Sequence, residues 1–117
     1  MTLGITTDTN ALDALIYRPG YSSIALPIKA SEGAIAIGQV LEYDAASHAY
    51  EKRASGVTAA KYVVALEAAT VTTTVNLLCL VGGEVNMTGL DATSQAEADI
   101  KGALLGSGII VRSQTTL

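Results

Sequence analysis

Phenylalanine and tryptophan are absent from this sequence, and five tyrosines are its only aromatic residues. Large rings normally contribute a heavy share of the surface that a core buries. Apolar residues make up 50% of the 117 positions, so the core must consist of many contacts between small aliphatic side chains. A chain of this length suits one domain with a modest core. We therefore expect self-association, because burial between copies can supply what the core lacks.

Charge is also scarce, and basic clusters are missing. Charged residues make up 15% of the chain, and the net charge is -4. Lys52 and Arg53 form the only adjacent basic pair. Binding to DNA or RNA requires a cationic stripe that displaces counterions from phosphate. The composition therefore argues against nucleic acid as a partner.

Cysteine occurs once, as Cys79, which excludes an intrachain disulfide. Residues 1–10 lack the basic segment and apolar run of a signal peptide. The longest apolar run is too short to cross a bilayer. We therefore expect a soluble protein that is made in a cytoplasm and has no membrane partner.

Side chains that could carry chemistry are few and dispersed. His48, the only histidine, lies in an expected turn and is interpreted as a solvent-exposed residue rather than a general base. Cys79 lies between two leucines and is interpreted as a core residue rather than a nucleophile. The glycines of residues 102–108 follow a helix and open a strand, which is the reverse of a phosphate-binding loop. The carboxylates are scattered, so the sequence predicts no catalytic, cofactor or metal site and no enzyme.

Alternating apolar residues predict a hairpin in the first half of the chain. Residues 35–43 alternate as one strand, a polar turn follows at 44–48, and residues 50–53 return. Residues 23–30 also alternate, but Pro27 cannot donate to a sheet, so this segment is expected at an edge or as irregular structure.

The second half of the chain is expected to add further strands. Residues 59–67 fit a helix or a strand, and the pair Val63 and Val64 favours a strand that continues after a bend. The threonine-rich residues 71–75 read as a half-exposed strand. Residues 77–81 are apolar at every position, which is typical of a strand covered on both faces. Gly82 and Gly83 then predict a turn or bulge, with a return over residues 84–87.

One helix is expected near the C-terminus. Ser94 and Glu97 have the spacing of a capping box, in which each side chain satisfies a free backbone N–H. Gly106 or Gly108 can adopt the left-handed conformation that ends the helix, and residues 109–111 form a closing strand. The apolar face of this helix comprises Ala96, Ile100, Ala103 and Leu104.

The N-terminal residues leave two interpretations open. Leu3 and Ile5 alternate with polar neighbours, and the spacing of Leu12, Leu15 and Ile16 could form one apolar helical face. A turn signal follows at residues 18–20. This segment either folds onto its own core or is an arm that docks on a partner.

From residue 27 onward, the order of segments resembles the lambda-type head decoration proteins of tailed bacteriophages. In that family the corresponding pieces are a hairpin, a long bent strand pair, a glycine-punctuated strand, and a late helix that leads into a final strand. The pieces that carry the resemblance are residues 40–44 with 50–51, residues 64–74, residues 80–85, and residues 101–104 with 108–111. Lys61 and Tyr62 depart from the family, where glycine is expected.

The resemblance implies a mainly β, β-clip-like fold in which bent β-ribbons form a small incomplete barrel with one short C-terminal α-helix. Residues 24–117 would form the body of a homotrimer, and residues 1–23 would form an arm. The arm would add a strand to the major capsid protein through main-chain hydrogen bonds. Its expected capsid-binding residues are Leu3, Ile5, Leu12, Leu15, Ile16 and Tyr17.

The function implied is that of a capsid decoration protein on the outer surface of the virion. The trimer would bind the expanded head at three-fold positions and stabilise the shell against the pressure of packaged DNA. The alternative is a small β-rich receptor- or glycan-binding module of a virion fibre. That alternative predicts an exposed aromatic patch, for which Tyr17, Tyr21 and Tyr50 are the candidates.

Overall fold

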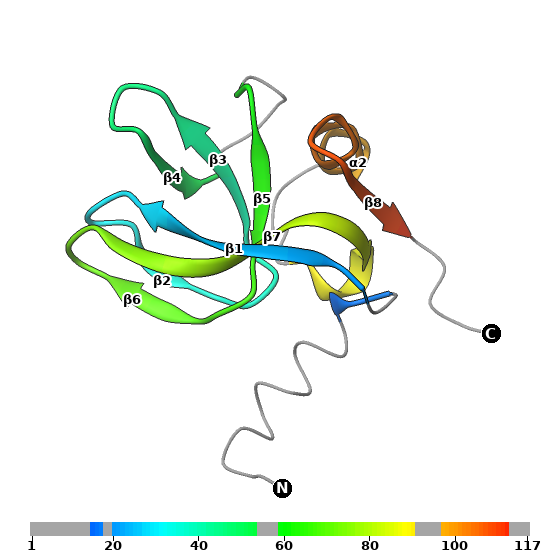
Figure 1. Cartoon of the computed structure of the whole chain (residues 1–117), viewed down its shortest axis with the longest axis horizontal. Coiled ribbons are helices and arrows are strands. Elements are labelled where there is room, and N and C mark those ends of the chain that lie inside the picture. Colours follow the sequence, from blue (N-terminus) through cyan, green and yellow to red (C-terminus); the bar gives the residue numbers. More distant parts are fainter. Residues whose placement is uncertain (1–14, 18–19, 54–58, 91–96, 113–117) are drawn as a thin grey trace, which may run out of the picture.

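The computed structural model describes residues 15–17, 20–53, 59–90 and 97–112, and it is mainly β with one α-helix in these ranges (Figure 1). The elements in chain order are β1 (Ser22–Ile28), β2 (Gly33–Ile35), β3 (Val40–Asp44), β4 (Ala49–Lys52), β5 (Tyr62–Ala65), β6 (Ala69–Val71), β7 (Val75–Asn86), the 3-10 helix η1 (Met87–Gly89), α2 (Glu97–Gly106) and β8 (Ile109–Arg112).

Six strands form a sheet that curls into an incomplete ring. Their order is β1-β4-β3-β5-β7-β8, and β1 also pairs with β7. The link between β1 and β4 consists of the single register pair Ile28 and Tyr50, so the ring does not close into a barrel. The predicted fold, a mainly β incomplete barrel with one short C-terminal helix, is confirmed.

Strand β7 connects most of this sheet, because it pairs with the three strands β1, β5 and β8. It runs without interruption through Gly82 and Gly83, so the predicted return at residues 84–87 is wrong. The predicted bulge is present instead: Ser22 lies opposite Gly82 whereas Ser23 lies opposite Leu80, which leaves Val81 as the extra residue. Gly83 has φ +130, and a Cβ there would lie 2.8 Å from the Cβ of Tyr21. Glycine is required at this position because Tyr21 lies directly against the backbone of β7.

The predicted hairpin forms from β3 and β4, but its first strand is shorter than expected. Ile35 belongs to β2, which pairs with β6 in a separate two-stranded sheet. The chain turns at Ile37 and Gly38, and Gly38 has φ +94. The alternation over residues 35–43 therefore spans two strands of different sheets.

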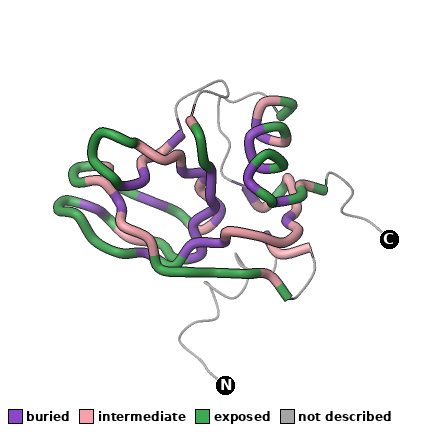
Figure 2. The backbone as a smooth tube through the Cα atoms, turned by 45° about the horizontal axis from the view of Figure 1, so that its top comes forward, coloured by how far each residue is buried: buried purple, intermediate pink, exposed green. Residues whose placement is uncertain are grey.

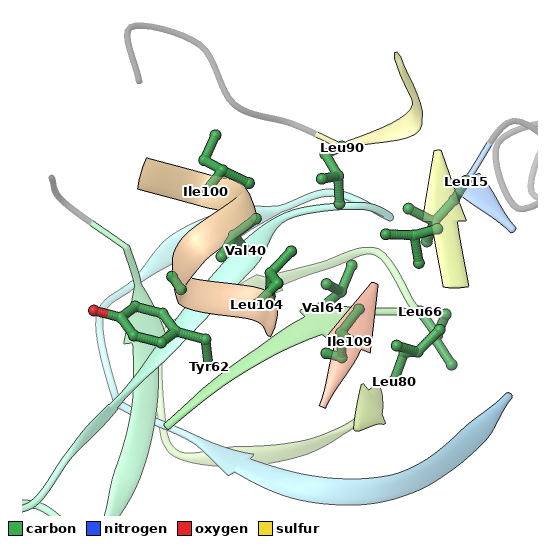
Figure 3. Close-up of a cluster of buried hydrophobic side chains, with 12 residues drawn as sticks. Leu15, Val40, Tyr62, Val64, Leu66, Leu80, Leu90, Ile100, Leu104 and Ile109 are labelled. Atoms are coloured by element: carbon green, nitrogen blue, oxygen red, sulfur yellow. The ribbon is translucent and has the colours of Figure 1, made fainter. Parts of the chain in front are cut away.

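Strand β5 lies between two clusters of buried side chains. The helix-side core contains Leu15, Val40, Tyr62, Val64, Leu66, Leu80, Val85, Leu90, Ile100, Ala103, Leu104 and Ile109 (Figure 3). The ribbon-side core contains Ile28, Ile35, Leu41, Tyr50, Val63, Ala65, Val71, Leu77 and Cys79. All four residues of β5 are buried because alternate side chains enter the two cores.

The sequence predicts that residues 77–81 form a strand covered on both faces. In the structure the strand covered in this way is β5 instead. Leu78, within β7, is 38% exposed, and buried and exposed residues are interspersed along the strands of the sheet (Figure 2). The threonine-rich stretch also differs from expectation. Strand β6 ends at Val71, and Thr72, Thr73 and Thr74 form the exposed connection to β7.

Helix α2 covers one end of the sheet beside β8 (Figure 1). Its predicted apolar face is confirmed for Ile100, Ala103 and Leu104, which are buried. Gly108 has φ +90 and donates its N–H to the carbonyl of Leu105 at 3.0 Å, so it is the residue that ends the helix. Ser94 and Ala96 lie outside the described residues.

Candidate functional site

The segment that precedes β1 crosses the second half of β7. Leu15 is fully buried in the helix-side core (Figure 3). Ile16 forms an isolated antiparallel bridge with Val85, and Tyr17 donates its N–H to the carbonyl of Glu84 at 3.1 Å. Ile16 and Tyr17 therefore add a short strand-like pairing to this part of β7.

Side-chain contacts from β8, on the other edge of β7, also hold the N-terminal segment in place. Arg112 of β8 forms an ion pair with Glu84 of β7, with a distance of 3.0 Å from Nη2 to Oε1. The guanidinium also lies 5.5 Å from the centre of the Tyr17 ring, in cation–π contact. The N-terminal segment, β7 and β8 are therefore joined in one polar cluster.

This geometry bears on the expected arm residues. Leu15, Ile16 and Tyr17 contact the body of their own chain, so Leu15 has no side-chain surface left for a partner. Leu3, Ile5 and Leu12 lie outside the described residues. The division into an arm of residues 1–23 and a body of residues 24–117 stays a prediction, and within it the described residues 15–17 contact the body.

The two side chains considered for nucleophilic chemistry occupy the places expected of structural residues. His48 is an exposed turn residue with φ +56, and its Nδ1 lies 3.4 Å from the hydroxyl of Tyr43. Cys79 is fully buried in the ribbon-side core, and burial raises the pKa of its thiol to about 12. A thiol with that pKa is almost entirely protonated at neutral pH and is a poor nucleophile.

Two scattered carboxylates meet at a position that the sequence did not indicate. Asp44 of β3 and Glu51 of β4 each lie 3.1 Å from the Nζ of Lys29, which directly follows β1. Hydrogen bonds from Ser47 and then from Lys29 lower the pKa of Asp44, and the two carboxylates raise the pKa of Lys29. Both carboxylates contact the same ammonium group, so this cluster is an ion triad rather than an acid–base pair.

The residues that the structure describes contain no group of His, Cys, Asp or Glu side chains arranged to hold a metal ion. Among the helices in the described ranges, none has the length and apolar character needed to cross a bilayer.

A second feature that the sequence did not indicate is the antiparallel ribbon of β1 and the first half of β7. Residues 19–28 and 68–83 contain no charged side chain. We call the surface formed by residues 22–27 and 75–81 the charge-free ribbon. The carboxylate of Glu67 nonetheless reaches the middle of this ribbon, where it accepts the N–H of Leu78 at 2.8 Å. The lack of charge in each of the two segments can be seen in the sequence. That the two segments pair with each other cannot.

The tyrosines proposed for a ligand patch are dispersed. Tyr50 is 8% exposed and belongs to the ribbon-side core, whereas Tyr17 stacks with Arg112 and Tyr21 packs against the helix-side core. They do not form one exposed aromatic surface.

Neither a family model nor a curated protein matches this chain.

Proposed function

We propose that this chain is a capsid decoration protein of a tailed bacteriophage, which binds the expanded head as a homotrimer and stabilises the shell. The observation that carries the proposal is the ordered resemblance to the lambda-type family, together with the elements that the same residues form. Residues 40–51 form the hairpin of β3 and β4, and residues 64–74 include the end of β5, a bend and β6. Residues 80–85 lie in the glycine-punctuated β7, and residues 101–111 run from α2 into β8.

The charge distribution supports a place outside the genome compartment. The chain carries 11 acidic and 7 basic residues, and three of the six cations in the described ranges, namely Lys29, Lys101 and Arg112, form ion pairs with carboxylates. A surface of this kind has little to offer to DNA phosphates.

The mechanism is cross-bridging by a multivalent particle. One trimer contacts several subunits of the major capsid protein, so weak individual contacts add up through effective concentration. The contact we propose uses residues 1–14 as the arm, with Leu3, Ile5 and Leu12 as its apolar anchors. Strand addition to the capsid protein would supply affinity through main-chain hydrogen bonds.

Binding to shells tests the proposal. Purified protein is mixed with expanded empty capsids and, as a matched control, with unexpanded capsids of the same virus. We expect stoichiometric binding to the expanded form and a higher temperature of shell disruption. Absence of binding to the expanded shell would overturn the proposal.

The arm is tested separately with a chain that begins at Leu15. This chain keeps every described contact of the body, so we expect the same oligomeric mass and thermal unfolding as the full chain but no binding to shells. Full binding by the shortened chain would show that the capsid contact lies in the body.

The alternative, a receptor- or glycan-binding module of a virion fibre, has less support. It needs an aromatic patch at the surface, and the positions of Tyr17, Tyr21 and Tyr50 give it no support.

A further inference from the structure

Between Ile16 and Ser22 the chain contains more residues than the strand beside it. Ile16 lies opposite Val85 of β7. Ser22 lies opposite Gly82 of the same strand, so six steps along this segment correspond to three steps along β7. Antiparallel strands advance together, one residue for one, when their pairing is unbroken. Three residues are therefore in excess of what a continuous edge strand would need.

The excess falls between Tyr17 and Tyr21. Tyr17 donates its N–H to the carbonyl of Glu84. Tyr21 lies against the next residue of β7, Gly83, where an added Cβ would be 2.8 Å from the Cβ of Tyr21. Gly20, the last of the three residues that separate the two tyrosines, is exposed, has φ +89 and has nothing within 4 Å of an added Cβ. The strand-like pairing is therefore interrupted at the surface of the molecule.

The segment before this interruption, residues 15–17, has a shorter main-chain pairing than β1. We call it the N-terminal strap (Figure 1). Within the described residues its pairing with β7 comprises the bridge of Ile16 and the hydrogen bond of Tyr17, whereas all seven residues of β1 are paired with β7. Side chains add the burial of Leu15 and the contact of Arg112 with the Tyr17 ring. A short pairing of this kind opens at a lower free energy than a strand within a continuous ladder.

We propose that the N-terminal strap opens from β7 while β1 stays paired, and that the three excess residues uncouple the two. In an unbroken strand, lifting one end pulls on the next residue of the ladder. Here the excess absorbs the movement before it reaches Ser22. An open strap adds residues 15–20 to the chain that precedes the ladder, which is about 20 Å when extended.

This inference deepens the proposed function and rests on it only for the use of the added length. An arm that docks on the capsid protein can be drawn out by opening of the strap, without loss of the sheet. In the free protein two side-chain contacts hold the strap in place. Leu15 fills part of the helix-side core, and Arg112, which is held by Glu84 at 3.0 Å, lies 5.5 Å from the centre of the Tyr17 ring. Arg112 is the contact that can be removed without emptying the core.

Hydrogen exchange of the full chain, followed residue by residue by NMR, tests the proposal. The amide of Tyr17 reports on the strap. The amide of Ala65, which donates to the carbonyl of Gln39 at 2.9 Å, and the amides of β1 that pair with β7 report on the body. We expect Tyr17 to exchange at least about tenfold faster than these amides, at a rate that low urea does not change, because local opening exposes little surface. Exchange of Tyr17 with the rate and urea dependence of Ala65 would overturn the inference.

A deletion tests the role of the excess residues. Removal of residues 18–20 joins Tyr17 to Tyr21, and Ile16 then falls opposite Val85 again, now in one unbroken strand with β1. The deletion should slow the exchange of Tyr17 to the rate of the β1 amides. A folded deletion variant in which Tyr17 still exchanges fast would overturn the uncoupling. If the deletion does not fold, the urea dependence in the unchanged chain decides.

Two further variants separate length and side-chain contact from other effects. Arg18→Gly with Pro19→Ser keeps the length of the segment and should leave the exchange of Tyr17 fast. Arg112→Met should raise the exchange rate of Tyr17 by about two- to fivefold, the range of a cation–π contact at an exposed site. Lys101→Met removes an exposed ion pair on α2 and should leave that rate unchanged. Equal effects of the two lysine and arginine variants would contradict the role of Arg112.

The outcomes are distinguishable from those of the proposed function, because exchange is measured on the free protein. A strap that opens in a chain that binds no shell would support this inference and contradict the proposed function. A strap that is as protected as the body in a chain that binds shells would overturn the inference and leave the proposed function standing.

Discussion

Tyr62 supplies much of the bulk that other proteins obtain from phenylalanine and tryptophan. It is the largest fully buried side chain among those described, with 2% of its surface exposed. Its ring lies in the helix-side core, and its hydroxyl accepts the N–H of Ala59 at 2.9 Å (Figure 3). Its own N–H donates to the Oγ of Ser107 at 2.9 Å, which joins β5 to the end of α2. The polar end of a tyrosine therefore has a structural task that phenylalanine could not perform.

Tyr62→Phe should destabilise the protein by about 1 kcal/mol, because the partly buried N–H of Ala59 loses its acceptor. Tyr43→Phe is the matched control, since its hydroxyl makes only a 3.4 Å contact with the exposed His48. The control should stay within about 0.5 kcal/mol of the unchanged protein. Urea unfolding measures both, and equal losses at the two positions would contradict this account.

Two glycines should respond to alanine in opposite directions. At Gly83 a Cβ would lie 2.8 Å from the Cβ of Tyr21, and φ is +130, so Gly83→Ala should cost about 1–3 kcal/mol. At Gly102, inside α2, nothing lies within 4 Å of an added Cβ, so Gly102→Ala should stabilise by about 0.5–1 kcal/mol. Thermal unfolding of the two variants tests the pair. A stabilised Gly83→Ala would show that the close approach of Tyr21 to β7 is not maintained.

At the scale of elements, the join between β1 and β4 depends on polar contacts more than on strand pairing. The ion triad of Lys29, Asp44 and Glu51 lies beside the single register pair that links these strands. The carboxylate of Glu32 adds a further contact, because it accepts the N–H of Lys52 at 2.7 Å. Side chains here replace the ladder that a longer β1–β4 pairing would provide.

Lys29→Met should lower stability most near neutral pH. The folded pKa of Asp44 lies below its usual 3.8, so its contribution is present above that value and is lost as the pH falls through the folded pKa. The folded pKa of Lys29 lies above its usual 10.5, so its contribution is present below that value and is lost as the pH rises through the folded pKa. The difference in melting temperature between the two proteins should therefore shrink below about pH 4 and above about pH 10.

Lys101→Met is the control for the triad. Lys101 pairs with Glu97 one turn earlier on α2, at 2.9 Å, and such exposed pairs contribute about 0.3–0.5 kcal/mol. A melting-temperature loss for Lys29→Met that is no larger than the control, or that does not vary with pH, would contradict the role given to the triad.

Local signals predicted the elements whose neighbours lie close in sequence. The β3–β4 hairpin follows from alternation on both sides of one polar turn, and the buried face of α2 follows from helical spacing. Where the outcome depended on distant residues, the sequence misled. Gly82 and Gly83 signal a turn, but β7 stays extended there because β8 and residues 16–17 pair with it from both sides. The alternation over residues 35–43 gives no sign that Ile35 pairs with β6 instead.

The same reasoning applies to the candidate surfaces. The apolar character of Leu15 was visible, but only the fold shows that its partners are in β7, α2 and β8. The charge-free runs were visible as well, yet the pairing of Ala25 with Leu78 joins residues more than fifty positions apart. Sequence spacing carries no information over that range without the register of the sheet.

At the scale of the whole molecule, the first and last described segments meet in one core. Leu15 and Ile109 are both fully buried in the helix-side core, and Ile16 and Arg112 lie on opposite edges of β7. Residues 15–17 therefore pack against the same strands and core as the last described strand.

Leu15→Ala should cost about 2–5 kcal/mol, which is typical of a fully buried leucine. Removal of residues 1–14 keeps every described contact, and we expect the free energy of unfolding to stay within about 0.5 kcal/mol of the full chain. Chemical denaturation of the two proteins sets the boundary between arm and body. A small loss for Leu15→Ala would move that boundary toward β1.

The meeting of the first and last described segments in one core also has a consequence for how the protein folds during synthesis. A ribosome adds about 5–20 residues per second, so roughly 5–20 s pass between the synthesis of Leu15 and that of Ile109. During most of that time β7, the main pairing partner of β1, has not been synthesised, and the helix-side core lacks α2 and β8. The helix-side core can be completed only after β8 has been synthesised, and a chain interrupted before β7 leaves the strand Ser22–Ile28 without its main partner.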